Sequence, residues 1–401
     1  MPVSNRRPRP LDPTTARDGG SARGASSAGG KAGKGKRPRR KDPLWARLTV
    51  ILGALLMLGS GGTIVGSEVL ISHVTSGIQQ DNLLGNAGKT EVERKGKLEG
   101  PINMLLLGVD ARERNKDKAN VRADTIIILH IPATHDQAYL LSIPRDTEVH
   151  VPPFEKSGYP GGVAKATEAF MHGAQNGAGW AGGAQLLAET IHNMTGITFD
   201  GAAIINFHGF KGIIDALGGV YLCVDREVKS IHMTLVDGKP MWNHEARKVS
   251  GHKEPVVHKK GCREMKGWEA LDYSRQRYSL PNGDYDRQKN QQKLLKAMAK
   301  KATDTGVLTN PLKINELIKA AGKAFILDTG GVPIEEFVFA LRNIAANDLV
   351  MLRTNGGTFN STRDGRELLD ETSMAMFEAV KKDMLGEFVA NNPSVLASEK
   401  S

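Results

Sequence analysis

A run of twenty uncharged residues near the N-terminus limits how this chain can be arranged. The run extends from Leu48 to Ser67 and reads LTVILGALLMLGSGGTIVGS. An α-helix rises about 1.5 Å per residue, so a helix of this length spans about 30 Å, the thickness of the hydrocarbon core of a bilayer. The run therefore predicts a transmembrane helix over residues 44–67. A cleaved signal peptide and a buried core helix are the alternatives.

Nearly all of the net positive charge precedes this run. Residues 1–43 contain twelve Lys or Arg and three acidic residues, a net charge of +9 out of +10 for all 401 residues. They are rich in Pro, Gly, Ser and Arg, which predicts a disordered tail. Since basic residues flank membrane spans on the cytoplasmic side, we expect a cytoplasmic tail, a single span in the cell membrane and an extracellular remainder. A signal peptide would export the same remainder.

The remainder is divided by composition into three parts. Residues 68–98 predict a stalk or linker, residues 99–386 one ordered domain and residues 387–401 a C-terminal tail. Within the domain, short apolar runs predict strands, and segments with helical periodicity and a final Gly predict helices. The strand-like runs are INMLLLGV, DTIIILHI, AYLLSI and AAIINF, and the helix-like segments are GAQLLAETIHNMTG and FKGIIDALGG. This interleaving predicts a layered α/β fold.

Residues 225–262 are polar, show no sustained period and contain four histidines, His232, His244, His252 and His258. The spacings of 12, 8 and 6 residues match no compact metal-ligand motif, so we expect no structural metal there. Cys223 and Cys262 flank this segment. In an oxidising compartment a disulfide between them, across 39 positions, would stabilise the fold by roughly 3 to 4 kcal/mol. Two free buried thiols are the alternative.

The segment Ser274–Gln292, SRQRYSLPNGDYDRQKNQQ, has an ordered arrangement of charges. If residues 272–278, DYSRQRY, are extended, Arg275 and Arg277 point to one face, because side chains at i and i+2 share a side of a strand. The turn signal PNGD then precedes a helix, whose first turn holds Asp284, Asp286 and Arg287. On that helix one stripe contains Arg287, Gln291, Leu294 and Met298.

An arginine on the inward stripe of a helix needs a partner, because burying an isolated charge is costly. The donor fork of arginine suits phosphate and pyrophosphate oxygens, so three arginines in this segment favour a pyrophosphate site. The alternative for Arg287 is a structural bridge to Asp284 or to a carboxylate in the core.

Acidic residues stand at the ends of predicted strands, where ligand crevices form in α/β sheets. Asp110 follows the first strand and Asp124 begins the second. Two carboxylates brought together there would repel each other unless a cation lay between them, and Mg²⁺ prefers such oxygen ligands. Arg145 and Asp146 follow the third strand; we expect Arg145 to join the arginines and Asp146 to orient one of them.

These motifs make the chain similar to the LytR-CpsA-Psr (LCP) family of membrane-anchored enzymes that attach glycopolymers to the cell wall. The matching segments, in order within residues 101–300, are NMLLLGVDAR, RADT, LLSIPRDTEV, NFHGFKGIIDALGGV, KGWEALDYSRQRY and GDYDRQKNQQ. The resemblance implies an α/β/α domain with a central mixed sheet. It also implies a Mg²⁺-dependent phosphotransferase that moves a glycopolymer from a polyprenyl-pyrophosphate carrier to peptidoglycan, forming a phosphodiester. Teichoic acid, arabinogalactan and capsule are all candidate polymers.

Carried over residue by residue, the resemblance implies that Asp110 and Asp124 bind Mg²⁺. The residues expected to bind the pyrophosphate are Arg122, Arg145, Arg275, Arg277, Arg287 and Gln291. Those expected to be catalytic are Arg145, Arg277, Arg287 and Asp284.

Two other functions stay open at this point. A pyrophosphatase acting on the same lipid-linked glycan would need the same site, because water and a sugar hydroxyl can take the same position. A membrane-tethered transcriptional regulator would use the basic tail, but that tail lacks interleaved aromatic residues and a helix-turn-helix pattern. We therefore expect the tail to contact anionic membrane lipid and not nucleic acid.

Overall fold

The structure, a computed structural model, describes residues 79–90, 98–110 and 120–397, except for residues 279, 308–309, 323–324, 335, 338–339, 341–343 and 345–347. The predicted tail over residues 1–43 and the predicted transmembrane helix over residues 44–67 lie outside these ranges. Within the described ranges, no helix is both long and apolar enough to cross a bilayer.

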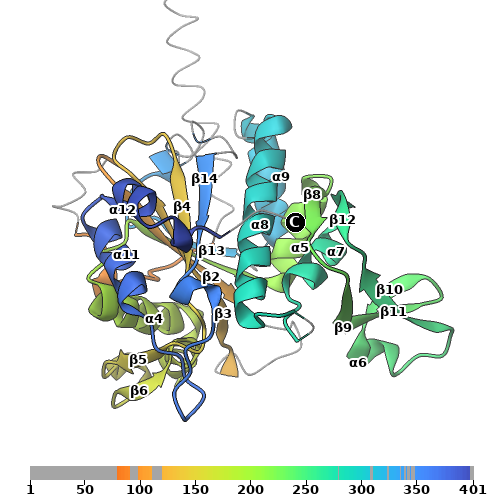
Figure 1. Ribbon diagram of the computed structural model, residues 1–401, viewed down its shortest axis with the longest axis horizontal. Helices are drawn as coiled ribbons and strands as arrows, with labels where there is room; N and C mark the ends of the chain where they lie inside the picture. The colour runs from red at the N-terminus through yellow and green to blue at the C-terminus, as the bar shows by residue number, and fades with distance from the viewer. Residues whose placement is uncertain are drawn as a thin grey trace, which may run out of the picture. The chain divides into compact units, whose positions relative to one another are not determined.

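A seven-stranded mixed sheet forms the centre of the domain (Figure 1). Its strand order is β1-β13-β7-β2-β3-β4-β14. The pairs β2–β3, β3–β4 and β7–β13 are antiparallel, and the other three pairs are parallel. The strands are β1 (Gln79–Gln80), β2 (Ile102–Val109), β3 (Ala123–Ile131), β4 (Ala138–Ser142), β7 (Gly201–Asn206), β13 (Phe325–Asp328) and β14 (Leu349–Leu352). The four strand-like runs all belong to this sheet, so the predicted α/β class with a central mixed sheet is confirmed.

These strands are apolar along both faces because both faces of the sheet are covered. In β2, Leu105 and Leu107 belong to one apolar core and Met104 to the other. Helices on one side of the sheet fill the first core, and α8 packs on the second (Figure 1). The helices of the first side are α3 (Ala166–Gly173), α4 (Gly179–Thr195), α11 (Glu371–Lys381) and α12 (Leu385–Asn391), and α8 runs from Asp284 to Asp304.

A smaller core lies beside the sheet, around Tyr273, Leu294 and Val220. It is built by α5 (Phe207–Ala216), α7 (Gly267–Ser274) and α8, with the two-stranded sheet of β8 (Val220–Val224) and β12 (Gly261–Met265). Helix α9 (Pro311–Ala321) packs against α5. A separate hairpin joins β5 (Glu148–Val151) to β6 (Gly162–Lys165).

Residues 225–262, for which the sequence shows no regular period, form a small antiparallel sheet; we call this segment the excursion. Its strands are β9 (Val228–Val236), β10 (Lys239–Trp242) and β11 (Lys253–His258), in the order β10-β9-β11, with the short helix α6 (Asn243–Ala246). A disulfide joins Cys223 to Cys262, which are paired residues of β8 and β12. The excursion is therefore closed by a covalent bond at its base.

Two predicted boundaries are corrected where the chain packs into the domain. Residues 79–90, expected in a stalk, contribute β1 to the sheet and bury Leu83 and Leu84 in the first core. Residues 387–397, expected in a tail, belong to α12 and to a bridge between Leu352 and Leu396. Neither segment has a periodic pattern long enough to indicate this packing. Their packing partners are also distant in sequence.

Candidate active site

Asp110 and Asp124 emerge at the same edge of the central sheet. Val109, the last residue of β2, pairs with Ala123 of β3 and with Asn206 of β7. The register shifts between Gly108, which pairs with Thr125, and Val109, so Asp124 is the extra residue of a β-bulge. Bulges commonly redirect a side chain next to a site. A Cβ at Gly108 would lie 2.8 Å from the Thr125 side chain, so only glycine fits this close approach.

Four charged side chains converge at this edge; we call Asp124, Arg145, Asp284 and Arg287 the inner cluster. Nη1 of Arg145 lies 2.7 Å from Oδ1 of Asp124, and Nη2 of Arg287 lies 2.8 Å from Oδ1 of Asp284. Nη2 of Arg287 also donates to the backbone oxygen of Asp124 at 2.9 Å, and Nε of Arg145 lies 4.0 Å from Asp284. The side chains of Arg145 and Arg287 are only 20% and 7% exposed.

Local sequence explains how these arginines reach the cluster. Arg145 leaves the buried end of β4 through Ile143 and Pro144, and its Nε is 3.5 Å from Asp146, the expected orienting partner. Asp284 and Arg287 lie in the first turn of α8, which begins after Gly283 (φ 52°), at the turn that the PNGD signal predicts. Carboxylates in a first helical turn are favoured by the helix dipole.

The inner cluster has polar atoms left over. Burial lowers the pKa of Arg145, but Asp124, Asp146 and Asp284 outweigh burial and raise that pKa above its ordinary value. Among the residues described, the Nε atoms of Arg145 and Arg287 are buried and have no hydrogen-bond partner. Each such group costs roughly 1 to 3 kcal/mol when it stays unpaired. A polar ligand held at this edge would offset that cost.

Glu367 supports the cluster and was missed from the sequence, where RDGRELLDE shows no motif. Its side chain is fully buried, and its Oε1 accepts hydrogen bonds from Tyr285, at the start of α8, and from Nδ2 of Asn355 at 3.0 Å. Its backbone donates to the oxygen of Asp146 at 2.9 Å. Burial raises the pKa of Glu367 to about 7; hydrogen bonds from Tyr285 and Asn355 oppose this, and Asp284 and Asp146 add to it.

Arg275 lies on the other side of Asp110. Its Nη2 is 3.5 Å from Oδ2 of Asp110, and its guanidinium carbon is 3.7 Å from the ring centroid of Phe207 and 5.3 Å from that of Trp242. Phe207 follows the end of β7, and Trp242 comes from the excursion. Two aromatic faces next to a guanidinium stabilise its charge by cation–π interaction. Neither aromatic residue was expected from the sequence.

The extended conformation predicted for residues 272–278 is wrong. Helix α7 continues to Ser274, and Arg275 still has nearly helical dihedrals (φ −97°, ψ −9°). Leu271 and Tyr273 are buried on this helix, and their packing decides its conformation. As a result, Arg277 does not share a strand face with Arg275; it stacks 4.5 Å from the ring centroid of Tyr278, a side chain that is 72% exposed.

The structure thus brings some of the predicted pyrophosphate residues together and leaves others apart. Arg145 and Arg287 belong to the inner cluster, and Arg275 reaches Asp110. Gln291 is half-buried on α8, one turn after Arg287. Arg122 is paired with a different residue: its side chain is 50% exposed and lies 3.8 Å from Glu168.

The donor set fits one hard divalent cation. Asp110 and Asp124 present carboxylate oxygens at adjacent strand ends, and Mg²⁺ typically takes one or two carboxylates together with substrate phosphates. In the described part of the chain, no three His, Cys, Asp or Glu side chains are grouped into a metal site made of protein ligands alone. The excursion histidines contact separate carboxylates, as in the pairs His258–Asp272, His252–Glu254 and His244–Glu245.

Comparison with known proteins gives relatives of both sequence and fold. The cell wall biosynthesis protein LcpA of Corynebacterium glutamicum is 26% identical over 371 residues, which cover 86% of this chain and 66% of LcpA. The polyisoprenyl-teichoic acid–peptidoglycan teichoic acid transferase TagU of Oceanobacillus iheyensis is 29% identical over 71% of this chain and 77% of TagU. This chain therefore spans about two thirds of the length of LcpA.

The crystal structure of gbs0355 from Streptococcus agalactiae superimposes with a TM-score of 0.56 at 21% identity, over 74% of this chain and 91% of gbs0355. At that identity the match shows a common fold only. The model of the LytR_cpsA_psr family matches residues 69–383, which include both the inner cluster and Arg275. The chain accordingly belongs to the LytR_cpsA_psr (LCP) family.

Proposed function

We propose that this protein is an enzyme that transfers a cell-wall glycopolymer from a polyprenyl-pyrophosphate carrier to peptidoglycan. The family assignment supports this proposal, as do the names of relatives, among them a polyisoprenyl-teichoic acid–peptidoglycan teichoic acid transferase. In the proposed reaction a hydroxyl of peptidoglycan attacks the phosphorus that carries the glycan. The bond to the bridging oxygen breaks, the polyprenyl monophosphate leaves, and the hydroxyl proton is released.

The inner cluster is the observation that carries the proposal. Two guanidiniums that are at most 20% exposed meet at one sheet edge, and their Nε donors have no hydrogen-bond partner among the residues described. A pyrophosphate supplies several acceptor oxygens and negative charge for such donors. Phosphoryl transfer depends chiefly on alignment and charge neutralisation, which fixed arginines provide without reorganising. Arg145 and Arg287 would bind the phosphates, and Asp284 would hold Arg287 in place.

Asp110 and Asp124 would hold Mg²⁺ in this proposal. When bound, the ion would neutralise charge on the phosphate oxygens. Arg145 and Arg275, which contact these two carboxylates, would keep them oriented toward the ion.

A membrane anchor with the domain outside the cell completes the proposal. The lipid carrier stays in the bilayer, so an enzyme tethered by residues 44–67 would meet it without diffusing through solution. The supporting observation is the uncharged run of twenty residues behind a tail of net charge +9.

The test is a transfer reaction with purified full-length protein in detergent. It contains Mg²⁺, a polyprenyl-pyrophosphoryl glycan and peptidoglycan oligomers, and mass spectrometry identifies the products. We expect a phosphodiester-linked glycan on the oligomers together with polyprenyl monophosphate. Release of a free glycan phosphate with unmodified oligomers would instead identify a pyrophosphatase, and an unchanged donor would refute both functions.

A further inference from the structure

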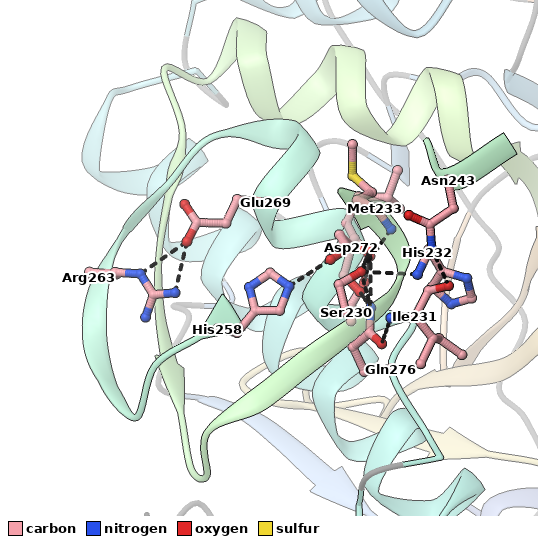
Figure 2. A network of polar contacts seen from close by, with 12 residues as sticks. Ser230, Ile231, His232, Met233, Asn243, His258, Arg263, Glu269, Asp272 and Gln276 are labelled. Atoms are coloured by element: carbon pink, nitrogen blue, oxygen red, sulfur yellow. Dashed lines mark hydrogen bonds and ion pairs between the residues drawn. The ribbon is translucent and has the colours of Figure 1, made fainter. Parts of the chain in front are cut away.

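A buried polar network lies between the excursion and α7 (Figure 2). We call its four side chains, Ser230, His258, Asp272 and Gln276, the brace. All four are at most 7% exposed, and Asp272 and Gln276 are fully buried. Oδ2 of Asp272 lies 2.7 Å from Nε2 of His258. Oδ1 of Asp272 accepts from Oγ of Ser230 at 2.9 Å and from Nε2 of Gln276 at 3.1 Å.

The brace connects three segments that are separate in sequence. Ser230 belongs to β9, His258 ends β11, and Asp272 lies in the last turn of α7. The backbone also takes part, because Oε1 of Gln276 accepts from the amide of Ile231 at 3.1 Å. A buried carboxylate is costly unless donors satisfy it, and here three side chains do. The network therefore specifies one position of α7 relative to β9 and β11.

That position determines where Arg275 lies. The amide of Arg275 donates to the backbone oxygen of Asp272 at 3.2 Å, and Gln276 is the next residue in the chain. The His232 imidazole, also on β9, forms a hydrogen bond with the backbone of Arg275. Trp242, on the neighbouring strand β10, lies over the guanidinium. The backbone and the side chain of Arg275 are thus both held by the excursion.

We propose that Asp272 and His258 are positioning residues that hold Arg275 over Asp110, so that the excursion is a working part of the active site. This inference rests on the proposed function, because it assigns a pyrophosphate to Arg275. If the brace only stabilises the fold, disrupting it should weaken ligand binding equally with and without the Arg275 side chain. If the brace positions Arg275, disrupting it should no longer weaken binding once the Arg275 side chain has been removed.

The test measures binding of farnesyl pyrophosphate with Mg²⁺ by calorimetry, with full-length protein in detergent. The variants are Asp272→Asn, Arg275→Ala and the double variant. Loss of a supporting contact typically weakens binding by about 10- to 100-fold, so we expect Asp272→Asn to raise Kd by roughly that factor. In the Arg275→Ala background the same substitution should change Kd by less than about twofold. An equal factor in both backgrounds, or no effect in either, would overturn the proposal.

His252→Ala is the matched control, because the His252–Glu254 pair lies on the same excursion but is exposed (76% and 60%). We expect wild-type Kd for this variant, and a weakening equal to that of Asp272→Asn would contradict a specific role of the brace. If Asp272→Asn does not fold, Ser230→Ala replaces it, since this change keeps the His258–Asp272 contact and should give the same pattern at smaller amplitude.

Hydrogen exchange separates failure of the brace from failure of the proposed function. Asp272→Asn should speed exchange in peptides covering residues 228–236 and 271–278 and leave the middle of α8 unchanged. If wild-type protein does not bind farnesyl pyrophosphate, the pyrophosphate site is refuted. The exchange data then test, independently of ligand binding, whether the brace holds the segment that contains Arg275. Unchanged exchange over residues 271–278 in Asp272→Asn would overturn that role.

Discussion

The arginines of the inner cluster and Arg275 are held in place in two different ways. The inner cluster is built on the central sheet and the first turn of α8, and Glu367 holds its segments together. Arg275 depends on an inserted sheet closed by a disulfide, and Asp272 holds its segment. In both places a fully buried carboxylate supports the arginine-bearing backbone; Glu367 comes from a distant segment, whereas Asp272 lies three residues before Arg275. The difference is that Asp272 accepts from three side chains, whereas Oε2 of Glu367 has no hydrogen-bond partner among the residues described.

The largest expected effect follows from removing an arginine of the inner cluster. We expect Arg287→Ala to lower the rate of glycan transfer by about 10³-fold, because one fixed donor to developing charge is worth about that factor. The change also leaves Asp284 buried without its partner, which destabilises a fold by roughly 3 to 5 kcal/mol. Arg287→Lys therefore serves as the second variant, since it keeps the charge and loses only the donor fork. Normal transfer by either variant would remove Arg287 from the proposed site.

The second prediction concerns the disulfide at the base of the excursion. Replacing both cysteines, Cys223→Ser with Cys262→Ser, should lower the free energy of unfolding by roughly 3 to 4 kcal/mol, because the unfolded chain is no longer cross-linked across 39 positions. Urea denaturation measures this loss, and wild-type protein in reducing agent is the control. The loss should be accompanied by faster hydrogen exchange in the excursion and not at Glu367. Equally faster hydrogen exchange in the excursion and at Glu367 would show that the inner cluster and the Arg275 region are not stabilised independently.

The third prediction is a pH dependence that arises from Glu367, the residue that supports the inner cluster. Burial raises the pKa of Glu367 from 4.5 to about 7, so the folded protein holds this proton more tightly than the unfolded chain does. Its contribution to stability is complete below the unfolded pKa and is lost as pH rises to about 7. At about 1.4 kcal/mol per pKa unit, the loss is on the order of 3 kcal/mol. Glu367→Gln should remove this part of the decline in urea-unfolding free energy between pH 4.5 and 8; an identical decline in wild type and variant would contradict it.

The smallest effect is expected at Arg122, which the resemblance places in the pyrophosphate site and the structure places beside Glu168 with half of its side chain exposed. Exposed ion pairs contribute about 0 to 1 kcal/mol. We therefore expect Arg122→Ala to change stability by less than about 1 kcal/mol and the transfer rate by less than about fivefold. A loss comparable to that of Arg287→Ala would extend the site beyond the inner cluster.

Features of the site that depend on local sequence were predicted well. The apolar runs of β2, β3 and β4 have the length and composition of strands buried on both faces, so Asp110, Asp124 and Arg145 were correctly placed at strand ends. The PNGD turn correctly predicted the start of α8 and the neighbouring Asp284 and Arg287. The conformation around Arg275 was wrong, because alternation over a few polar residues cannot compete with the packing of Leu271 and Tyr273.

Contacts between distant segments could not be predicted. Leu83 is buried in the first core and its amide donates to Oδ2 of Asp328, 245 positions away, and no pattern near Leu83 indicates that partner. Glu367 stands in a polar segment typical of a loop, yet it is fully buried against Tyr285, 82 positions away. Residues 225–262 similarly lack a sustained period, because their strands pair with each other and are buried unevenly: β10 has no buried residue and β11 has two.

The sequence by itself determined the kinds of chemistry available to this protein: carboxylates at strand ends, arginines around a turn, and the family motifs that contain them. Only the tertiary structure decided which arginines meet, placing Arg145 and Arg287 together, Arg275 between two aromatic rings and Arg122 elsewhere. The reason is physical. Local patterns report which face of an element must be buried, whereas the partner of a buried charge is selected by the packing of the whole domain.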